Sequence, residues 1–320
     1  MRHAIETVPY WRDRLGSGWQ DLRTTIDRDT FCALPLLRRV DIQRHGKELL
    51  SERIPTSHGR LIRSETSGST GRPIVRYGTE LTELFWRAFT LRDSLWHKRD
   101  LAGRLAAIRL KVESGESAGW GPATDAAYHT GPCALLNIRT DIDAQLDWLE
   151  SQAPRYLITM ASNLLWLAKR SLERGIRLPG LSQARSYGGA LPEETRSIVR
   201  EAWGVEVADI YTAEEAGYIA LQCPQFEHYH VQAEGLLVEV LDDMGKQCDP
   251  GEIGRVVVTT LHNFAMPLIR YELGDYAEVG EPCPCGRGLP VIRRILGRHR
   301  NLLRLPDGRR HWPSFPTDKW

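Results

Sequence analysis

Short apolar runs alternate with amphipathic helical patterns through the middle of this sequence, and that alternation limits the folds open to it. Runs of strand length lie at residues 105–110, 156–159, 184–187 and 205–210. Helical patterns occupy 81–96, the stretch from an N-cap at Ser162 to a glycine stop at Gly175, and the stretch from Pro192 to Gly204. Strands that alternate with helices favour a layered sheet, so the sequence predicts an α/β fold.

The pattern changes near residue 235. A strand pattern at 236–240 is followed by a turn at 243–245 and a second strand pattern at 255–260, with no helix between them. Consecutive strands joined by short turns pair antiparallel. We therefore predict a layered sheet-and-helix core with a smaller, mostly antiparallel β subdomain.

Charge and composition exclude several classes of protein. The 42 Lys and Arg residues nearly balance 41 Asp and Glu residues, which leaves a net charge of +1 and no field to attract nucleic acid or an anionic membrane. No apolar run approaches the roughly 18 to 20 residues that span a bilayer, so we expect a cytoplasmic protein without a membrane span. Six scattered cysteines do not resemble a secreted disulfide framework.

The stretch at 66–73 is the most informative loop. It combines four hydroxyl side chains with two glycines and closes on Pro73; its first six residues are Thr66, Ser67, Gly68, Ser69, Thr70 and Gly71. Glycines let successive backbone N–H groups point into one concavity, and hydroxyls add donors, so such a loop suits phosphate. It lacks the Gly-Lys-Ser/Thr ending of a Walker A loop. Taken by composition alone, it could equally be a Ser/Gly-rich surface loop.

The order and spacing of this loop resemble the nucleotide loop of adenylate-forming enzymes. Its closest likeness is to the phenylacetate-CoA-ligase-like (capsule-biosynthesis-type) branch, because Ile74 stands where many members of the wider family carry lysine. The resemblance implies that the loop embraces the β- and γ-phosphates of ATP, and that ATP and Mg²⁺ are cofactors. It also implies a carboxylic acid as the substrate.

Two further motifs of that family follow in order. The string 186–190 resembles the strand end against which adenine lies, which implies nucleotide contacts from Gly188, Gly189 and Ala190. The string 210–215 resembles the tyrosine-to-glutamate motif. This implies that Tyr211 and Thr212 lie at the adenine and that Glu215 holds magnesium, for which a hard carboxylate oxygen is suited.

This second motif departs from the usual pattern at two positions. Thr212 replaces the usual glycine, and Glu214 replaces a hydroxyl residue that normally approaches the α-phosphate. A carboxylate at that position would repel the phosphate unless it turns away or binds the metal. The doublet Glu214-Glu215 also leaves the register open.

The string 267–275 resembles the motif that ends in the ribose-binding aspartate, which implies this role for Asp275, since a carboxylate can accept both hydroxyl donors. The string 297–301 resembles the hinge motif and implies that Arg298 meets the ribose or the α-phosphate. Arg300 and Asn301 replace the usual acidic hinge residues, which puts a domain rotation there in doubt. The resemblance places the acyl pocket along 156–164 and Tyr187, although apolar residues of this kind more often form core.

Cysteine and histidine cluster on both sides of the predicted β subdomain. Three thiols and an imidazole could form a closed, tetrahedral structural zinc site. The resemblance implies Cys223, His230, Cys283 and Cys285 as the ligands, with His228 as the alternative imidazole. The competing interpretation is a set of unrelated loop cysteines and a surface His-x-His.

The resemblance covers nearly the whole sequence, including 8–10 and 34–36 in an N-terminal helical region. It implies a nucleotide- and acyl-binding core at 1–232, a β subdomain at 233–296, and at 297–320 the hinge and the truncated start of a C-terminal domain. Family members continue into a C-terminal domain that supplies a catalytic lysine, whereas Lys319 has no such domain to position it. We expect a further domain or a separate protein to supply that lysine.

Two functions follow from these motifs. The first is ATP-dependent activation of an organic carboxylic acid to its acyl-adenylate, with transfer to CoA where a C-terminal domain is present. The second is a non-catalytic nucleotide-binding module with a structural zinc site, suggested by Glu214, Arg300, Asn301 and the missing lysine domain. Tight nucleotide binding without pyrophosphate exchange would distinguish the second from the first.

Overall fold

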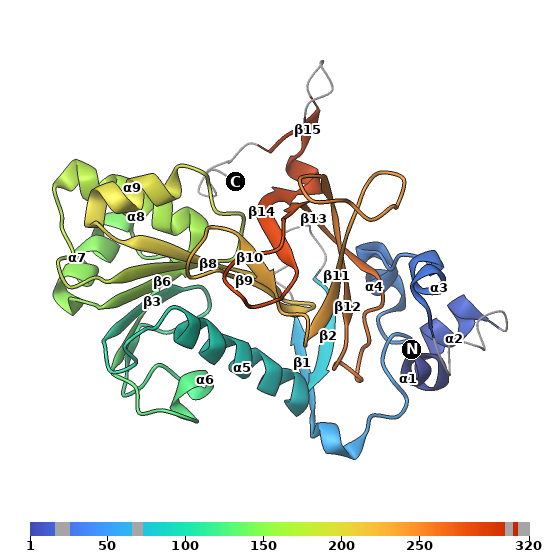
Figure 1. Cartoon of the computed structure of the whole chain (residues 1–320). Coiled ribbons are helices and arrows are strands. Elements are labelled where there is room, and N and C mark those ends of the chain that lie inside the picture. Colours follow the sequence, from blue (N-terminus) through green and yellow to red (C-terminus); the bar gives the residue numbers. More distant parts are fainter. Residues whose placement is uncertain (17–25, 66–72, 305–309, 313–320) are drawn as a thin grey trace.

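The computed structural model describes residues 1–16, 26–65, 73–304 and 310–312 (Figure 1). One sheet of 12 strands runs through the molecule in the order β11-β12-β13-β14-β10-β9-β8-β7-β6-β3-β5-β4. Helices cover both faces of its parallel part, so the fold is α/β, as the sequence predicts.

Five strands form the parallel part of this sheet. They are β3 (Leu105–Arg109), β5 (Cys133–Asn137), β6 (Tyr156–Met160), β7 (Gln183–Tyr187) and β8 (Glu206–Ala213), and a short antiparallel strand, β4 (Gly115–Ser117), closes the edge. These strands confirm all four of the strand patterns predicted between residues 105 and 210. The predicted acyl-pocket residues Tyr156, Leu157 and Ile158 lie buried in β6.

The helices divide between the two faces of the parallel part (Figure 1). On one face, α7 (Ile142–Gln152), α8 (Ala161–Arg174) and α9 (Thr195–Trp203) pack through Leu146, Leu164 and Val199 onto the strands. On the other face, α5 (Glu80–Trp96) packs through Phe89, near the short α6 (Pro122–Asp125).

Helix ends were predicted less well than helices. The N-cap prediction at Ser162 is wrong, because Met160 is the last residue with an extended backbone and α8 begins at Ala161. Similarly, α9 begins at Thr195 rather than Pro192, since a turn in which Thr195 N–H donates to Pro192 O precedes it. The stop at Gly175 is confirmed, with a φ of 69° that glycine adopts without strain.

The remaining strands of the large sheet are antiparallel. They are β9 (Gly217–Gln222), β10 (Tyr229–Val231), β11 (Leu236–Leu241), β12 (Ile253–Thr260), β13 (Tyr271–Val279) and β14 (Val291–Arg298). β8 joins the two parts, since it pairs parallel with β7 and antiparallel with β9. The predicted domain limits at 232 and 296 fall within the span of this sheet and stay predictions.

A helical N-terminal region packs against the antiparallel strands (Figure 1). It contains α1 (Arg2–Thr7), α2 (Pro9–Leu15), α3 (Arg28–Ala33), α4 (Arg39–His45) and the 3₁₀ turn η2 (Thr56–His58). A hairpin of β1 (Leu61–Glu65) and β2 (Val75–Thr79) then leads into α5. Leu37 forms an isolated bridge to Tyr271, which ties this region to β13.

Past β14 the chain forms η3 (His299–Asn301) and a small hairpin of β15 (Leu303–Arg304) and β16 (Arg310–His311). Trp312 follows this hairpin and its ring lies 5.3 Å from that of Tyr276 on β13. Among the described residues, no helix is both long and apolar enough to cross a membrane.

Candidate functional site

Three predicted nucleotide residues meet: Tyr211 near the end of β8, Asp275 in the middle of β13 and Arg298 at the end of β14. Tyr211 OH donates a hydrogen bond to Asp275 Oδ2 at 2.8 Å, and Arg298 Nε lies 2.9 Å from Asp275 Oδ1. Antiparallel pairing of β13 with β14 sets Asp275 directly opposite Arg298. The structure therefore gathers an aromatic ring, a carboxylate and a guanidinium from distant parts of the chain.

The electrostatics of this group keep the tyrosine neutral and the arginine charged. Burial, and then the Asp275 charge, raise the pKa of Tyr211 well above its usual value. Burial alone would lower the pKa of Arg298, but Asp275, Tyr211 and Glu215 outweigh it and the pKa is raised. Arg298 also donates from Nη1 to the Leu273 carbonyl at 3.0 Å, which fixes the guanidinium.

The predicted adenine turn begins where β7 ends and lies close to the same strands. Gly188 and Gly189 have φ values of 72° and 145°, conformations that residues with a Cβ rarely adopt. A Cβ built on Gly297 would lie 3.9 Å from the Ala190 Cβ and 3.5 Å from Trp312. The turn and the end of β14 are thus neighbours, and Trp312 covers them.

Glu215 lies in the turn between β8 and β9. Its side chain is 11% exposed and its Oε1 accepts from Arg39 Nη1 at 3.0 Å. Glu214, by contrast, is exposed. Burial distinguishes the two members of the doublet and favours Glu215 as the inward carboxylate.

Glu215 and Arg298 are linked through Tyr271. Burial and the Glu215 charge raise the pKa of Tyr271, while Arg39 and Arg298 lower it to a smaller extent. The magnesium position and the ribose position that the sequence predicts therefore share one electrostatic environment. Thr212 lies between them on β8 and pairs with Tyr218.

The predicted phosphate loop, residues 66–71, lies outside the described residues. Its two flanking strands are described, and Glu65 pairs with Val75 at its base. Glu215 and the turn 188–190 follow strands, Tyr211 and Arg298 lie near strand ends, and Asp275 lies in the middle of β13. Tyr211 and Asp275 are in direct contact.

Sequence reasoning missed several partners of these residues. Arg39 pairs with Glu215 across 176 positions, and no local pattern in α4 indicates it. Asp209 is also buried beneath the site, where Ser186 Oγ and Tyr229 OH donate to its two carboxylate oxygens at 2.5 and 2.6 Å. An aspartate inside the strand pattern 205–210 was the one visible signal, because a carboxylate rarely lies in a buried strand without partners.

Three of the predicted zinc ligands and the alternative imidazole His228 converge at a different place, between the β9–β10 and β13–β14 connections, whereas Cys285 is not part of this group. Ligand atoms of Cys223, His228, His230 and Cys283 lie within 4.8 Å of one another. Cys223 Sγ lies 3.9 Å from Cys283 Sγ, and Cys285 Sγ lies 3.3 Å from His230 Nε2. Zinc bond lengths of about 2.0 to 2.3 Å imply tetrahedral edges of about 3.3 to 3.8 Å. The separation of Cys285 from His230 lies in this range, and that of Cys223 from Cys283 is slightly longer.

This cluster offers five donors for four positions. His228 Nε2 and His230 Nδ1 are buried, and neither has a hydrogen-bond partner among the described residues. Two thiolates with two imidazoles, or three thiolates with one, would both satisfy zinc. The choice between the imidazoles stays open, as it was from the sequence.

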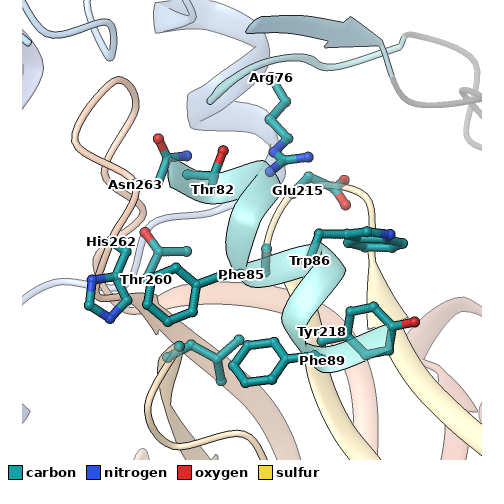
Figure 2. Close-up of a pocket in the computed structure, with 14 residues that line it drawn as sticks. Arg76, Thr82, Phe85, Trp86, Phe89, Glu215, Tyr218, Thr260, His262 and Asn263 are labelled. Carbon is teal, nitrogen blue, oxygen red and sulfur yellow. The ribbon is translucent and has the colours of Figure 1, made fainter. Parts of the chain in front are cut away.

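A pocket adjoins the Glu215 turn (Figure 2). Its apolar part is formed by four aromatic residues of α5 and β9: Phe85, Trp86, Phe89 and Tyr218. Arg76 of β2 and Glu215 lie at one end, and His262 and Asn263 of the connection after β12 lie at the other.

Solved structures with the same fold are acyl-CoA ligases. The chain superposes on an open conformation of 2-hydroxyisobutyryl-CoA ligase, solved with 2-HIB-AMP and CoA, with a TM-score of 0.74, 19% identity, and coverage of 98% of this chain and 75% of that one. An anthranilate CoA ligase in complex with anthranoyl-AMP gives a TM-score of 0.56 and 18% identity over 78% of this chain and 49% of that one. The chain therefore has the fold of the adenylate-forming ligases.

Sequence relatives narrow this class. The chain is 27% identical to the phenylacetate-coenzyme A ligase of Thermus thermophilus over 317 residues, which cover 95% of this chain and 68% of that enzyme. It is 24% identical to the phenylacetate-coenzyme A ligase of Pseudomonas putida, over 95% of this chain and 69% of that enzyme. No model of a known protein family matches it. By sequence this chain is similar to phenylacetate-coenzyme A ligases, and by fold it is similar to adenylate-forming ligases.

Proposed function

We propose that this chain activates an organic carboxylic acid with ATP, forming an acyl-adenylate, and that CoA accepts the acyl group. The observation that carries the proposal is the contact of Tyr211 and Arg298 with the two oxygens of Asp275. Residues predicted separately as adenine, ribose and hinge positions meet in one group. Similarity to two phenylacetate-coenzyme A ligases and the shared ligase fold support the same reaction.

In the first step, a carboxylate oxygen of the acid attacks the α-phosphorus of ATP. The bond from that phosphorus to the bridging oxygen breaks, and pyrophosphate leaves with the bonding electrons. In the second step, the sulfur of CoA attacks the acyl carbon and AMP leaves. The chain's contribution is to hold the nucleotide in line and to neutralise the leaving group.

Each predicted residue has a role in this scheme. Asp275 accepts hydrogen bonds from the ribose hydroxyls, and Arg298 holds Asp275 and meets the ribose or the α-phosphate. Tyr211 lies along the adenine, together with Thr212 and the turn Gly188, Gly189 and Ala190. Residues 66–71 donate to the β- and γ-phosphates.

Glu215 is the residue that would hold Mg²⁺. A buried carboxylate provides the hard oxygen that magnesium prefers, and Arg39 donates to that oxygen at 3.0 Å. When bound, the ion would offset negative charge on the phosphates. Arg39 must then release or share the oxygen, so magnesium and Arg39 would compete for Glu215.

We also propose a structural zinc ion on Cys223, His230, Cys283 and Cys285, with His228 as the alternative imidazole. The possible ligands offer thiolate sulfurs and imidazole nitrogens, both of which suit zinc. Two of the imidazole nitrogens are buried without hydrogen-bond partners among the described residues. Four protein ligands leave no open position, so the ion would stabilise the fold rather than take part in catalysis.

Pyrophosphate exchange into ATP tests the reaction directly. We expect exchange that depends on magnesium and on one member of a panel of aryl, hydroxy and fatty acids. Asp275→Asn should abolish exchange, because the amide can no longer accept both ribose hydroxyls, whereas Asp147→Asn on the exposed face of α7 should not. If no acid in the panel supports exchange, the result would count against the proposed enzymatic function.

The second candidate function is nucleotide binding without catalysis. Glu214 supports it, since a carboxylate next to the α-phosphate position opposes a polyanion. This candidate predicts that ATP raises the midpoint of thermal unfolding without any exchange, because a ligand stabilises the folded state by mass action alone. Measuring both quantities on the same preparation separates the two functions.

A further inference from the structure

Arg76 is a half-buried cation that no predicted motif includes. It lies on β2 and its side chain points into the pocket beside Glu215 (Figure 2). Its Nε is buried and has no hydrogen-bond partner among the described residues. Burying an N–H donor without a hydrogen-bond partner costs free energy. A ligand that accepts a hydrogen bond from this N–H would recover that free energy.

Three carboxylates surround Arg76, and one of them, Glu215, is the proposed magnesium ligand. Burial lowers the pKa of Arg76, and the charges of Glu83, Glu215 and Glu214 oppose that effect. Glu83 comes from α5 and the other two from the turn after β8. The guanidinium therefore lies beside the proposed magnesium ligand.

The hairpin also brings Arg76 to the base of the predicted phosphate loop. Glu65 pairs with Val75, and Ser64 pairs with Arg76, so the loop spans the residues between Glu65 and Val75. Arg76 is one position beyond the closing pair. The hairpin register thus places Arg76 one pair below Glu65 and Val75, and the pocket places its guanidinium beside Glu215.

We propose that Arg76 binds the β- and γ-phosphates of ATP and neutralises charge on the departing pyrophosphate. The inference rests on the proposed function. A guanidinium presents several N–H donors in a planar fork that matches phosphate oxygens, and its charge is retained even when it is buried. Thr82 and Trp86 line the pocket beside it, and the apolar wall strengthens an ionic contact by excluding water.

The test compares the affinities of ATP and AMP, because only ATP carries the phosphates that Arg76 would contact. Titration calorimetry with magnesium is done on the full chain and on Arg76→Gln, Arg76→Lys and Arg60→Gln. Arg60 is the matched control, since it is the arginine just before β1 and its side chain is 89% exposed. Inorganic pyrophosphate serves as a third ligand.

We expect Arg76→Gln to weaken ATP and pyrophosphate binding by about tenfold or more, the factor that about 1.4 kcal/mol represents. AMP affinity should change less than about twofold, which also shows that the variant is folded. Arg76→Lys should recover part of the ATP affinity, and Arg60→Gln should match the unaltered chain.

Three results would overturn the assignment. Equal losses for ATP and AMP in Arg76→Gln would make Arg76 a structural residue. Unchanged ATP affinity in that variant would remove it from the phosphate site while leaving the proposed function intact. Failure of the unaltered chain to bind either nucleotide would refute the proposed function itself, and the role of Arg76 with it.

Discussion

Asp209 illustrates how a single buried carboxylate can be held in a strand. It lies on β8, and its two oxygens accept from Ser186 and Tyr229 on neighbouring parts of the sheet. Burial raises its pKa to about 6 from the ordinary 3.8, although both hydrogen bonds and the charge of Arg196 act in the opposite direction. The loss of solvation on burial therefore changes the pKa of Asp209 more than these three interactions do.

This pKa predicts how Asp209 changes stability with pH. Because the folded value is raised, Asp209 favours the folded state below about pH 4 and loses that contribution as pH rises through about 6. The free energy of unfolding of the unaltered chain, minus that of Asp209→Asn, should fall by about 3 kcal/mol across this range. Urea unfolding at a series of pH values measures the difference.

Subtracting the variant removes other groups that titrate in the same range. His97, whose pKa is lowered to about 4 chiefly by burial, is present in both proteins and cancels. A difference that rises with pH would mean that Asp209 has a lowered pKa instead.

At the scale of elements, cysteine and histidine side chains link two connections beside the paired strands β10 and β14. Cys223 follows β9, His230 lies in β10, and Cys283 and Cys285 lie between β13 and β14. These four residues bring the β9–β10 turn against a loop that starts about 50 residues later in the chain.

We therefore predict about one zinc per chain by metal analysis. A strong chelator should lower the thermal midpoint by several degrees, because metal binding energy is folding energy when the ligands are apart in the unfolded chain. Cys283→Ser should abolish zinc binding, while Cys32→Ser, at an exposed thiol, should retain it. Full zinc content in Cys283→Ser would refute the proposed ligand set.

At the scale of the whole molecule, one buried ion pair fastens the N-terminal helical region to the antiparallel strands. Arg270 donates to both oxygens of Glu239 on β11, at 2.9 and 3.1 Å. Its Nη1 also donates to the carbonyls of Leu34 and Cys32, which lie at the end of α3. The pair therefore connects the N-terminal helices with two strands of the sheet.

Removing this cation should destabilise the chain strongly. Arg270→Met leaves Glu239 buried without a partner, and we expect a loss of about 3 to 5 kcal/mol in the free energy of unfolding. Arg200→Met is the matched control, since Arg200 binds Glu206 in the same two-bond manner but at an exposed site. That control should cost at most about 1 kcal/mol.

A second variant distinguishes the ion pair from simple packing. Replacing both partners, with Arg270→Met and Glu239→Leu, should recover much of the loss because no unpaired charge remains buried. The loss of hydrogen bonds to Leu34 and Cys32 would persist. Equal instability of the single and double variants would show that these carbonyl contacts dominate. Chemical denaturation followed by circular dichroism measures all four proteins.

Much of the fold was predictable because local pattern reports local structure. The strands at 105–110 and 184–187 and the helix at 81–96 appear where apolar spacing predicts them. Helix starts were less predictable, since Ser162 has the chemistry of a cap and Met160 does not, yet backbone geometry selected Met160. The nucleotide residues were predicted through family motifs, which record spacing and residue type, and their roles stay predictions.

By itself, the sequence determined which segments become strands and helices, because the period of apolar residues and the glycine stops act over a few neighbours. Only the tertiary structure decided which side chains meet. Asp275 faces Arg298 through the register of β13 with β14, Tyr211 reaches Asp275 across 64 positions, and Glu215 finds Arg39 across 176. Such contacts depend on strand order and register, which are set by burying a common core and which no short stretch of sequence encodes.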